Sequence, residues 1–129
     1  MSVFEAYRSV VSEDLDDLMH VNNVRYVQWV QDLAKAHWES VTTPLQQHEN
    51  IWVLLSHHID YKWAAKLNDE IHLKTYVILS KGVTSTRIVE MYLKGTDKLI
   101  VKSETTWCLL DSKNKKPKRI TSEIAELFH

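Results

Sequence analysis

The sequence has little of the residues that cross-link or interrupt a chain: one cysteine, two glycines and two prolines among 129 residues. A single cysteine, Cys108, excludes an intramolecular disulfide framework and is typical of a reducing compartment. So few glycines and prolines leave little room for linkers, and we expect one domain over residues 1–129. The sequence also lacks a signal-peptide pattern and any apolar run long enough to span a bilayer. It therefore predicts a cytoplasmic protein that does not enter a membrane.

The sequence also lacks an excess of charge of either sign, because 16 basic residues nearly balance 17 acidic ones and the formal net charge is −1. Such a balance argues against a protein that binds nucleic acid through bulk positive charge. One segment departs from it, because residues 113–119 contain five basic side chains. This segment is either a solvated turn or a contact for the phosphates of a nucleotide-tailed substrate.

Signatures of several catalytic classes are missing as well. The chain has no Gly-rich phosphate loop, no dinucleotide fingerprint and no Gly-x-Ser-x-Gly elbow. Cys108 lies in an apolar strand and is expected in the core. His57 and His58 are neighbours on a predicted strand, so their side chains point to opposite faces and cannot share one metal ion. We therefore expect no metal and no cofactor, and neither serine nor cysteine hydrolysis.

Hydrophobic periodicity divides the chain into one long helix and several strands. Residues 22–40 have the three- and four-residue spacing of a helix. Its apolar stripe is expected at Val27, Val30, Leu33 or Ala34, His37 and Val41, with Val24, Tyr26, Trp29 and Trp38 on other faces. A helix that is apolar over so much of its circumference is expected to be wrapped by other elements, and the stretch around Thr42-Thr43-Pro44 should end it.

Period-two alternation and β-rich composition predict the strands. They are expected at residues 3–12, 51–63, 70–80, 84–94 and 98–110, and a short helix is expected at residues 121–128. Turns at Lys81-Gly82 and Gly95-Thr96-Asp97 are tight, so the last three strands should pair antiparallel. The fold class is therefore α+β, with one buried helix against a curled antiparallel sheet.

A group of polar side chains stands where the long helix begins. Asp16, His20, Asn22 and Asn23 lie within eight residues. Asp16 can act as a base or nucleophile, His20 can orient the carboxylate, the water or the substrate carbonyl, and backbone N–H groups over residues 23–25 can face an oxyanion. Alternatively, Asp16 and the two asparagines only cap the helix and His20 is a loop histidine.

At these residues the sequence resembles the hotdog-fold thioesterases. The resemblance rests on Asp14-Leu15-Asp16 followed by His20-Val21-Asn22-Asn23-x-x-Tyr26, and it is greatest to acyl-ACP thioesterases and the 4-hydroxybenzoyl-CoA thioesterase-like family. It implies a hotdog fold, in which an antiparallel sheet wraps one long central helix. It also implies hydrolysis of acyl-CoA or acyl-ACP thioesters, by a homodimer or homotetramer with active sites at the dimer interface.

The resemblance assigns roles to particular residues. The catalytic group is expected to be Asp16, His20 and Asn23, and the substrate-binding group Asn22, Tyr26 and His58. Asp14 is expected to be structural, and Trp29, Trp52, Trp63 and Tyr26 are expected to line the core or an acyl channel.

The sequence also departs from its relatives at a few positions. Leu18 replaces an Asn usual in the acyl-ACP branch, and Met19 replaces a Gly common in CoA-type members. Residues 62–65 lack the glutamate that the acyl-ACP branch carries there. Two other functions stay open: a non-catalytic acyl-thioester sensor and an enoyl-thioester hydratase or dehydratase.

Overall fold

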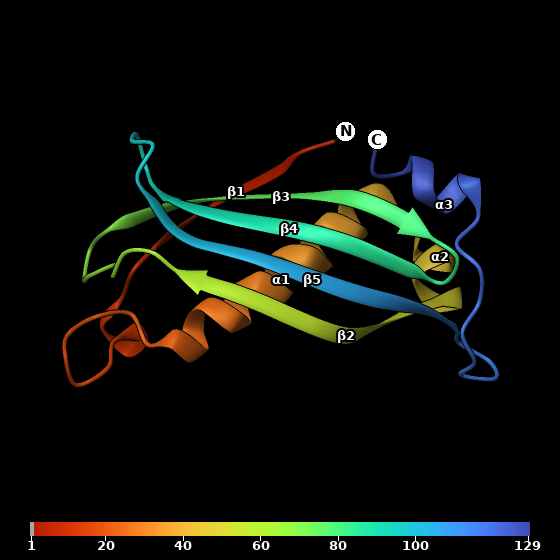
Figure 1. Cartoon of the computed structure of the whole chain (residues 1–129), viewed down its shortest axis with the longest axis horizontal. Coiled ribbons are helices and arrows are strands. Elements are labelled where there is room, and N and C mark those ends of the chain that lie inside the picture. Colours follow the sequence, from red (N-terminus) through yellow and green to blue (C-terminus); the bar gives the residue numbers. More distant parts are fainter. Residues whose placement is uncertain (1) are drawn as a thin grey trace.

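The computed structural model describes residues 2–129, and its main feature is a five-stranded antiparallel sheet with a long helix along one face (Figure 1). The sheet has the order β1-β3-β4-β5-β2, so β1 and β2 are its edges. The strands are β1 (Phe4–Ser9), β2 (Asn50–Tyr61), β3 (Glu70–Lys81), β4 (Thr84–Leu93) and β5 (Leu99–Asp111). The helices are α1 (Asn23–Val41), α2 (Pro44–Glu49), α3 (Ser122–Glu126) and the short 3-10 helix η1 (Ser12–Asp14).

This architecture confirms the predicted α+β fold, with an antiparallel sheet around one long central helix. Two local features differ from the prediction. The first strand ends at Ser9 rather than at residue 12, and the chain then turns through η1. The helix α2 was not predicted, although its sequence carries the signals: Thr43 and Gln46 form a capping box, and Pro44 occupies the first turn.

The face that α1 buries is broader than the predicted stripe. Its buried residues are Tyr26, Trp29, Val30, Leu33, Ala34, His37 and Trp38. Tyr26, Trp29 and Trp38 therefore belong to the core-facing side, whereas Val27 and Val41 are half-buried and Val24 is 71% exposed. Large aromatic side chains remove more apolar surface from water than valines do, and they settle the orientation of the helix.

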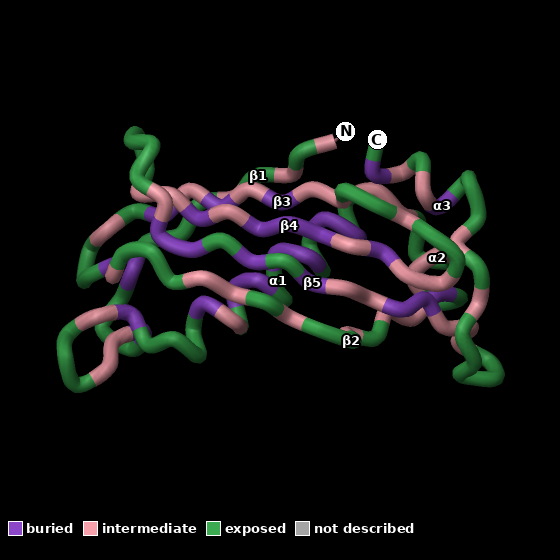
Figure 2. The backbone as a smooth tube through the Cα atoms, in the orientation of Figure 1, coloured by how far each residue is buried: buried purple, intermediate pink, exposed green. Residues whose placement is uncertain are grey.

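The core lies between α1 and the inner face of the sheet. Cross-strand pairing brings Thr75, Val89, Ser103 and Ile59 side by side across four strands, and this row faces the helix. One apolar cluster packs around Tyr26, Trp29 and Val30, and a second around Trp38, Leu109, Ile124 and Phe128. Figure 2 shows the buried backbone along β4, β5 and α1, with the exposed positions concentrated in loops and on β2.

Within residues 2–129, no helix is long and apolar enough to cross a membrane.

Candidate active site

The loop before α1 is fixed to the helix by Asp14, which is 6% exposed. Its carboxylate accepts a hydrogen bond from the backbone N–H of Val11 (3.0 Å) and pairs with Arg25 Nε at 3.5 Å. Its backbone carbonyl accepts from the N–H of Asn22 (2.8 Å). Asp14 therefore ties the loop to the first turn of the helix and has no room to act on a substrate.

Asp16 closes a tight five-residue loop. Its Oδ1 accepts from the backbone N–H of Leu18 (2.9 Å) and of His20 (3.3 Å), and its own N–H donates to the carbonyl of His20 (2.8 Å). Among residues 2–129, no donor binds Oδ2. One carboxylate oxygen is thus held by backbone amides, while the other remains available to a ligand.

The same loop needs a left-handed residue, which is Met19 with φ 62°. Side chains with a Cβ adopt this conformation at a cost, and glycine adopts it freely. A glycine at position 19 would therefore adopt this backbone conformation without that cost.

At the helix start, Asn22 is the N-cap. Its Oδ1 accepts from the N–H of Val24 (3.0 Å), and its carbonyl accepts from the N–H of Arg25 (2.9 Å). Of the three N–H groups expected to face an oxyanion, those of Val24 and Arg25 therefore already have partners. The N–H of Asn23 has none in the described part of the chain, and it stands at the positive end of the helix dipole.

A cavity of about 370 Å³ lies beside this loop and the start of α1. Asp16, His20, Asn23 and Tyr26 line one side, together with Leu18 and Val21, and residues 61–64 form the opposite wall. The structure therefore brings together four of the six residues that the sequence singled out.

The other two residues lie elsewhere. Asn22 is exposed and is occupied as the helix cap. His58 lies on β2 outside the cavity lining, is exposed, and contacts Asp60 Oδ2 through Nε2 at 3.2 Å. Its neighbour His57 points to the other face and contacts Ser103 Oγ at 2.9 Å, as strand alternation predicts.

Tyr26 holds the two walls of the cavity together. Its hydroxyl accepts a hydrogen bond from the N–H of Ala65 (3.2 Å), and the carbonyl of Ala65 accepts from the N–H of Val21 (2.9 Å). The ring is 2% exposed, and burial raises the pKa of Tyr26 above its usual value. The phenol is therefore protonated at neutral pH and serves as a structural contact between α1 and the segment after β2.

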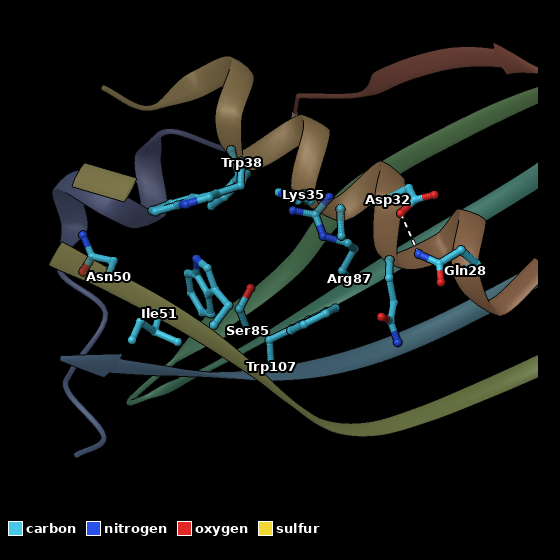
Figure 3. Close-up of a pocket in the computed structure, with 13 residues that line it drawn as sticks. Gln28, Asp32, Lys35, Trp38, Asn50, Ile51, Ser85, Arg87 and Trp107 are labelled. Carbon is cyan, nitrogen blue, oxygen red and sulfur yellow. Dashed lines mark hydrogen bonds between the residues drawn. The ribbon is translucent and has the colours of Figure 1, made fainter. Parts of the chain in front are cut away.

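A second cavity of about 530 Å³ lies beside α1 from Gln28 to Trp38 and was not predicted (Figure 3). Arg87 on β4 lines it and is 5% exposed. The sequence held a signal for it: Arg87 shares strand parity with Val89 and Met91, so a charged residue stands at a core-facing position.

The basic segment 113–119 forms a turn after β5. Lys115 has φ 60°, its N–H donates to the carbonyl of Asp111 (2.9 Å), and its Nζ donates to the carbonyl of Ser112 (2.6 Å). This segment contributes no residue to either cavity.

Comparison with known proteins places the chain in a family. The family model described as the acyl-ACP thioesterase N-terminal domain matches residues 2–128. A search of curated proteins gives no match.

Solved structures share the fold at low sequence identity. A 1,4-dihydroxy-2-naphthoyl-CoA thioesterase from Synechocystis superposes with a TM-score of 0.83 at 16% identity, covering 99% of both chains. A hypothetical protein from Staphylococcus aureus in complex with CoA has a TM-score of 0.87 at 14% identity, covering 98% of this chain and 81% of that one. A 12:0-ACP thioesterase from Umbellularia californica has a TM-score of 0.83 at 15% identity, covering 98% of this chain and 51% of that one. Because the family model matches nearly the whole chain, the protein belongs to the family of the acyl-ACP thioesterase N-terminal domain and has the hotdog fold of these thioesterases.

Proposed function

We propose that the protein is a thioesterase that hydrolyses acyl-CoA or acyl-ACP thioesters in the cavity at the start of α1. The observation that carries this proposal is the placement of Asp16: its Oδ1 is fixed by two backbone amides, and its Oδ2 is free of protein donors among residues 2–129. Asn23 lines the same cavity, and its N–H, unpaired among residues 2–129, can stabilise negative charge there.

The chemistry follows from these two groups. The thioester carbonyl oxygen points at the N–H of Asn23, which stabilises the oxyanion as the carbonyl carbon is attacked. Asp16 takes the proton of the attacking water, the C–S bond breaks, and the proton returns to the thiolate, giving acid and thiol. In the alternative route Oδ2 of Asp16 attacks the carbonyl carbon, and the C–S bond breaks to release the thiolate and leave a mixed anhydride. Water then hydrolyses the anhydride to the free acid and the Asp16 carboxylate, and a proton from this water passes to the thiolate.

His20 and Tyr26 support this centre in different ways. The backbone of His20 closes the Asp16 loop, and its side chain lines the cavity, where it can orient the water or the carbonyl. Tyr26 positions the opposite wall through Ala65. The apolar side chains of Leu18 and Trp63 face the same cavity and suit the methylene groups of a thioester.

Both carriers named among the similar structures are candidates. One relative is named for a CoA thioester, another is described in complex with CoA, and a third is named for an ACP thioester. A panel that varies the acyl chain and presents each acyl group on CoA and on ACP separates these substrates.

The test measures thiol release by wild type, Asp16→Asn and Asp17→Asn. Asparagine keeps an oxygen that accepts the two backbone N–H bonds, so Asp16→Asn should fold but lose at least about 100-fold in kcat. Asp17 is the neighbouring exposed carboxylate and lines neither cavity, so Asp17→Asn is the matched control and should keep full activity. Full activity in Asp16→Asn would contradict the catalytic role of Asp16. Absence of thiol release from every CoA and ACP substrate would remove the thioesterase proposal itself.

We also propose that two copies pair along β2. This twelve-residue strand is a sheet edge, and Val53 and Leu55 on it are exposed at 40% and 58%. Each cavity has an end of β2 in its wall, so a second copy on this edge would help to enclose both. Light scattering after size-exclusion chromatography should give twice the 15.1 kDa chain mass or a larger even multiple. A monomer over the working concentration range would contradict this pairing.

A further inference from the structure

The second cavity is separate from the thioesterase centre. It lies between α1, from Gln28 to Trp38, and the strands β2, β4 and β5, and it shares no lining residue with the first cavity. Figure 3 shows Trp38 on α1 facing the strands, Trp107 on β5, and Arg87 extending from β4 towards the helix. Trp52 also lines it, so three tryptophans and the buried Arg87 share one cavity, and Arg87 Cζ lies 5.4 Å from the ring centroid of Phe128.

The guanidinium of Arg87 uses only part of its hydrogen-bonding capacity. Nη1 donates to His37 Nδ1 (2.9 Å) and to Thr75 Oγ1 (2.9 Å). In residues 2–129, Nε and Nη2 donate to no acceptor, and no carboxylate forms an ion pair with Arg87. A side chain that is 5% exposed thus presents a free Nε–Nη2 edge to the cavity.

The two protein partners of Arg87 are neutral. Burial lowers the pKa of His37 to about 4, with the charge of Arg87 contributing in the same direction, so the imidazole is uncharged at pH 7. Thr75 Oγ1 donates to the carbonyl of Ile88 (2.8 Å) and therefore accepts from Arg87.

Burial also lowers the pKa of Arg87 to about 10, which leaves it cationic at pH 7. Asp32 also lines the cavity, but its Oδ1 accepts from Gln28 Nε2 (2.8 Å) and it forms no ion pair with Arg87. Within residues 2–129 the buried positive charge of Arg87 is therefore not ion-paired, an arrangement that proteins rarely keep unless an anion binds there.

The free edge has a defined chemical preference. Nε and Nη2 are parallel donors, and this fork matches the two oxygens of one carboxylate. The cavity therefore offers a donor pair for an anion together with aromatic walls.

We propose that this cavity binds an apolar carboxylic acid, with the carboxylate on the Nε–Nη2 edge of Arg87 and the apolar body against Trp38, Trp52 and Trp107. The carboxylate has two possible sources, a free acid or the far end of an acyl group bound at Asp16. Positions 23 and 35 of α1 are roughly 18 Å apart at the rise of a helix, so only a long acyl group reaches both cavities. The binding proposal does not depend on hydrolysis at Asp16.

The first experiment compares an acid with its neutral twin. Isothermal titration at pH 7 measures 4-phenylbutyrate and 4-phenylbutanamide on wild type, Arg87→Gln and Arg119→Gln. A charged bidentate hydrogen bond should make the acid bind about 10- to 100-fold more tightly than the amide in wild type. Arg87→Gln should abolish that preference. Arg119 is exposed and lines neither cavity, so Arg119→Gln should keep it.

The comparison on wild type stands alone if Arg87→Gln does not fold. Equal affinity of acid and amide would overturn the proposal. Binding of neither compound would overturn it too, and this is the result expected if an acidic residue of a second copy already pairs with Arg87. An acid preference that survives in a folded Arg87→Gln would also overturn it.

A second experiment identifies the source of the carboxylate. Hexadecanoyl-CoA and its ω-carboxy analogue are compared on wild type and Arg87→Gln. If the acyl terminus supplies the carboxylate, Arg87→Gln lowers kcat/KM about 10-fold or more for the ω-carboxy substrate alone. If a free acid is the ligand, the two substrates respond alike, and 4-phenylbutyrate binding to Asp16→Asn equals that to wild type. The titration of the first experiment measures binding without turnover, so its result stays readable if the thioesterase proposal fails.

Discussion

Replacing Asp14 should lower stability but leave thioester hydrolysis intact, whereas replacing Asp16 should abolish hydrolysis. Asp14 is buried, accepts from the N–H of Val11 and pairs with Arg25, whose side chain is 44% exposed. Asp14→Asn keeps an acceptor for Val11 but loses the charge, so it should lower the free energy of unfolding by about 1–2 kcal/mol. Asp14→Ala removes the acceptor as well and leaves the N–H of Val11 unpaired, which should raise the loss to about 2–4 kcal/mol.

Urea unfolding followed by tryptophan fluorescence measures these losses, with the m-value expected to stay constant. Thiol release measured on the same variants at a temperature where they remain folded should show kcat within about threefold of wild type, because Asp14 does not reach the cavity lining. The reasoning is refuted if Asp14→Asn loses less than about 0.5 kcal/mol, or if it remains stable and its kcat falls as far as that of Asp16→Asn.

Three other predictions follow from single contacts. Met19→Gly removes a Cβ from a left-handed position and should leave stability unchanged or raise it by up to about 1 kcal/mol in urea unfolding; a loss above 1 kcal/mol would contradict the loop geometry. Tyr26→Phe removes the acceptor for the N–H of Ala65 and should cost about 1–3 kcal/mol of unfolding free energy; no loss would show that this bond is not needed. His37 has a folded-state pKa of about 4 against 6.5 unfolded, so the unfolded chain binds more protons between these values. Stability should therefore fall by up to about 3 kcal/mol as pH drops from 6.5 to 4, and His37→Gln should flatten this slope in pH-dependent urea unfolding; an unchanged slope would refute it.

The sequence was sufficient for the strands and the long helix because their signals are local. Alternation over residues 70–80 and 84–94 comes from a sheet with one face on the core, and β3 and β4 lie within one residue of those limits. The orientation of α1 was less predictable, since valines and tryptophans compete for the buried side and tertiary packing decides between them. In the structure Tyr26 and Trp29 are buried, whereas Val24 is exposed.

The site at the start of α1 was predictable in composition but not in detail. Spacing placed Asp16, His20 and Asn23 together, and the structure lines one cavity with them. The spacing in the sequence could not show that the side chain of Asn22 accepts a hydrogen bond from the N–H of Val24, because this bond depends on one side-chain rotamer. The role of Arg87 was not predictable for a different reason. It depends on hydrogen bonds to His37 and Thr75, which are distant from Arg87 in the sequence.

Single-turnover thiol release by Asp16→Asn, measured beside Asp17→Asn, tests whether Asp16 carries out the hydrolysis. With enzyme in excess over the best thioester of the panel, the observed rate reports the chemical step separately from product release. The account predicts that Asp16→Asn slows this step by at least about 100-fold while Asp17→Asn leaves it unchanged. A single-turnover rate in folded Asp16→Asn equal to that of wild type would contradict the role of Asp16 in thioester hydrolysis.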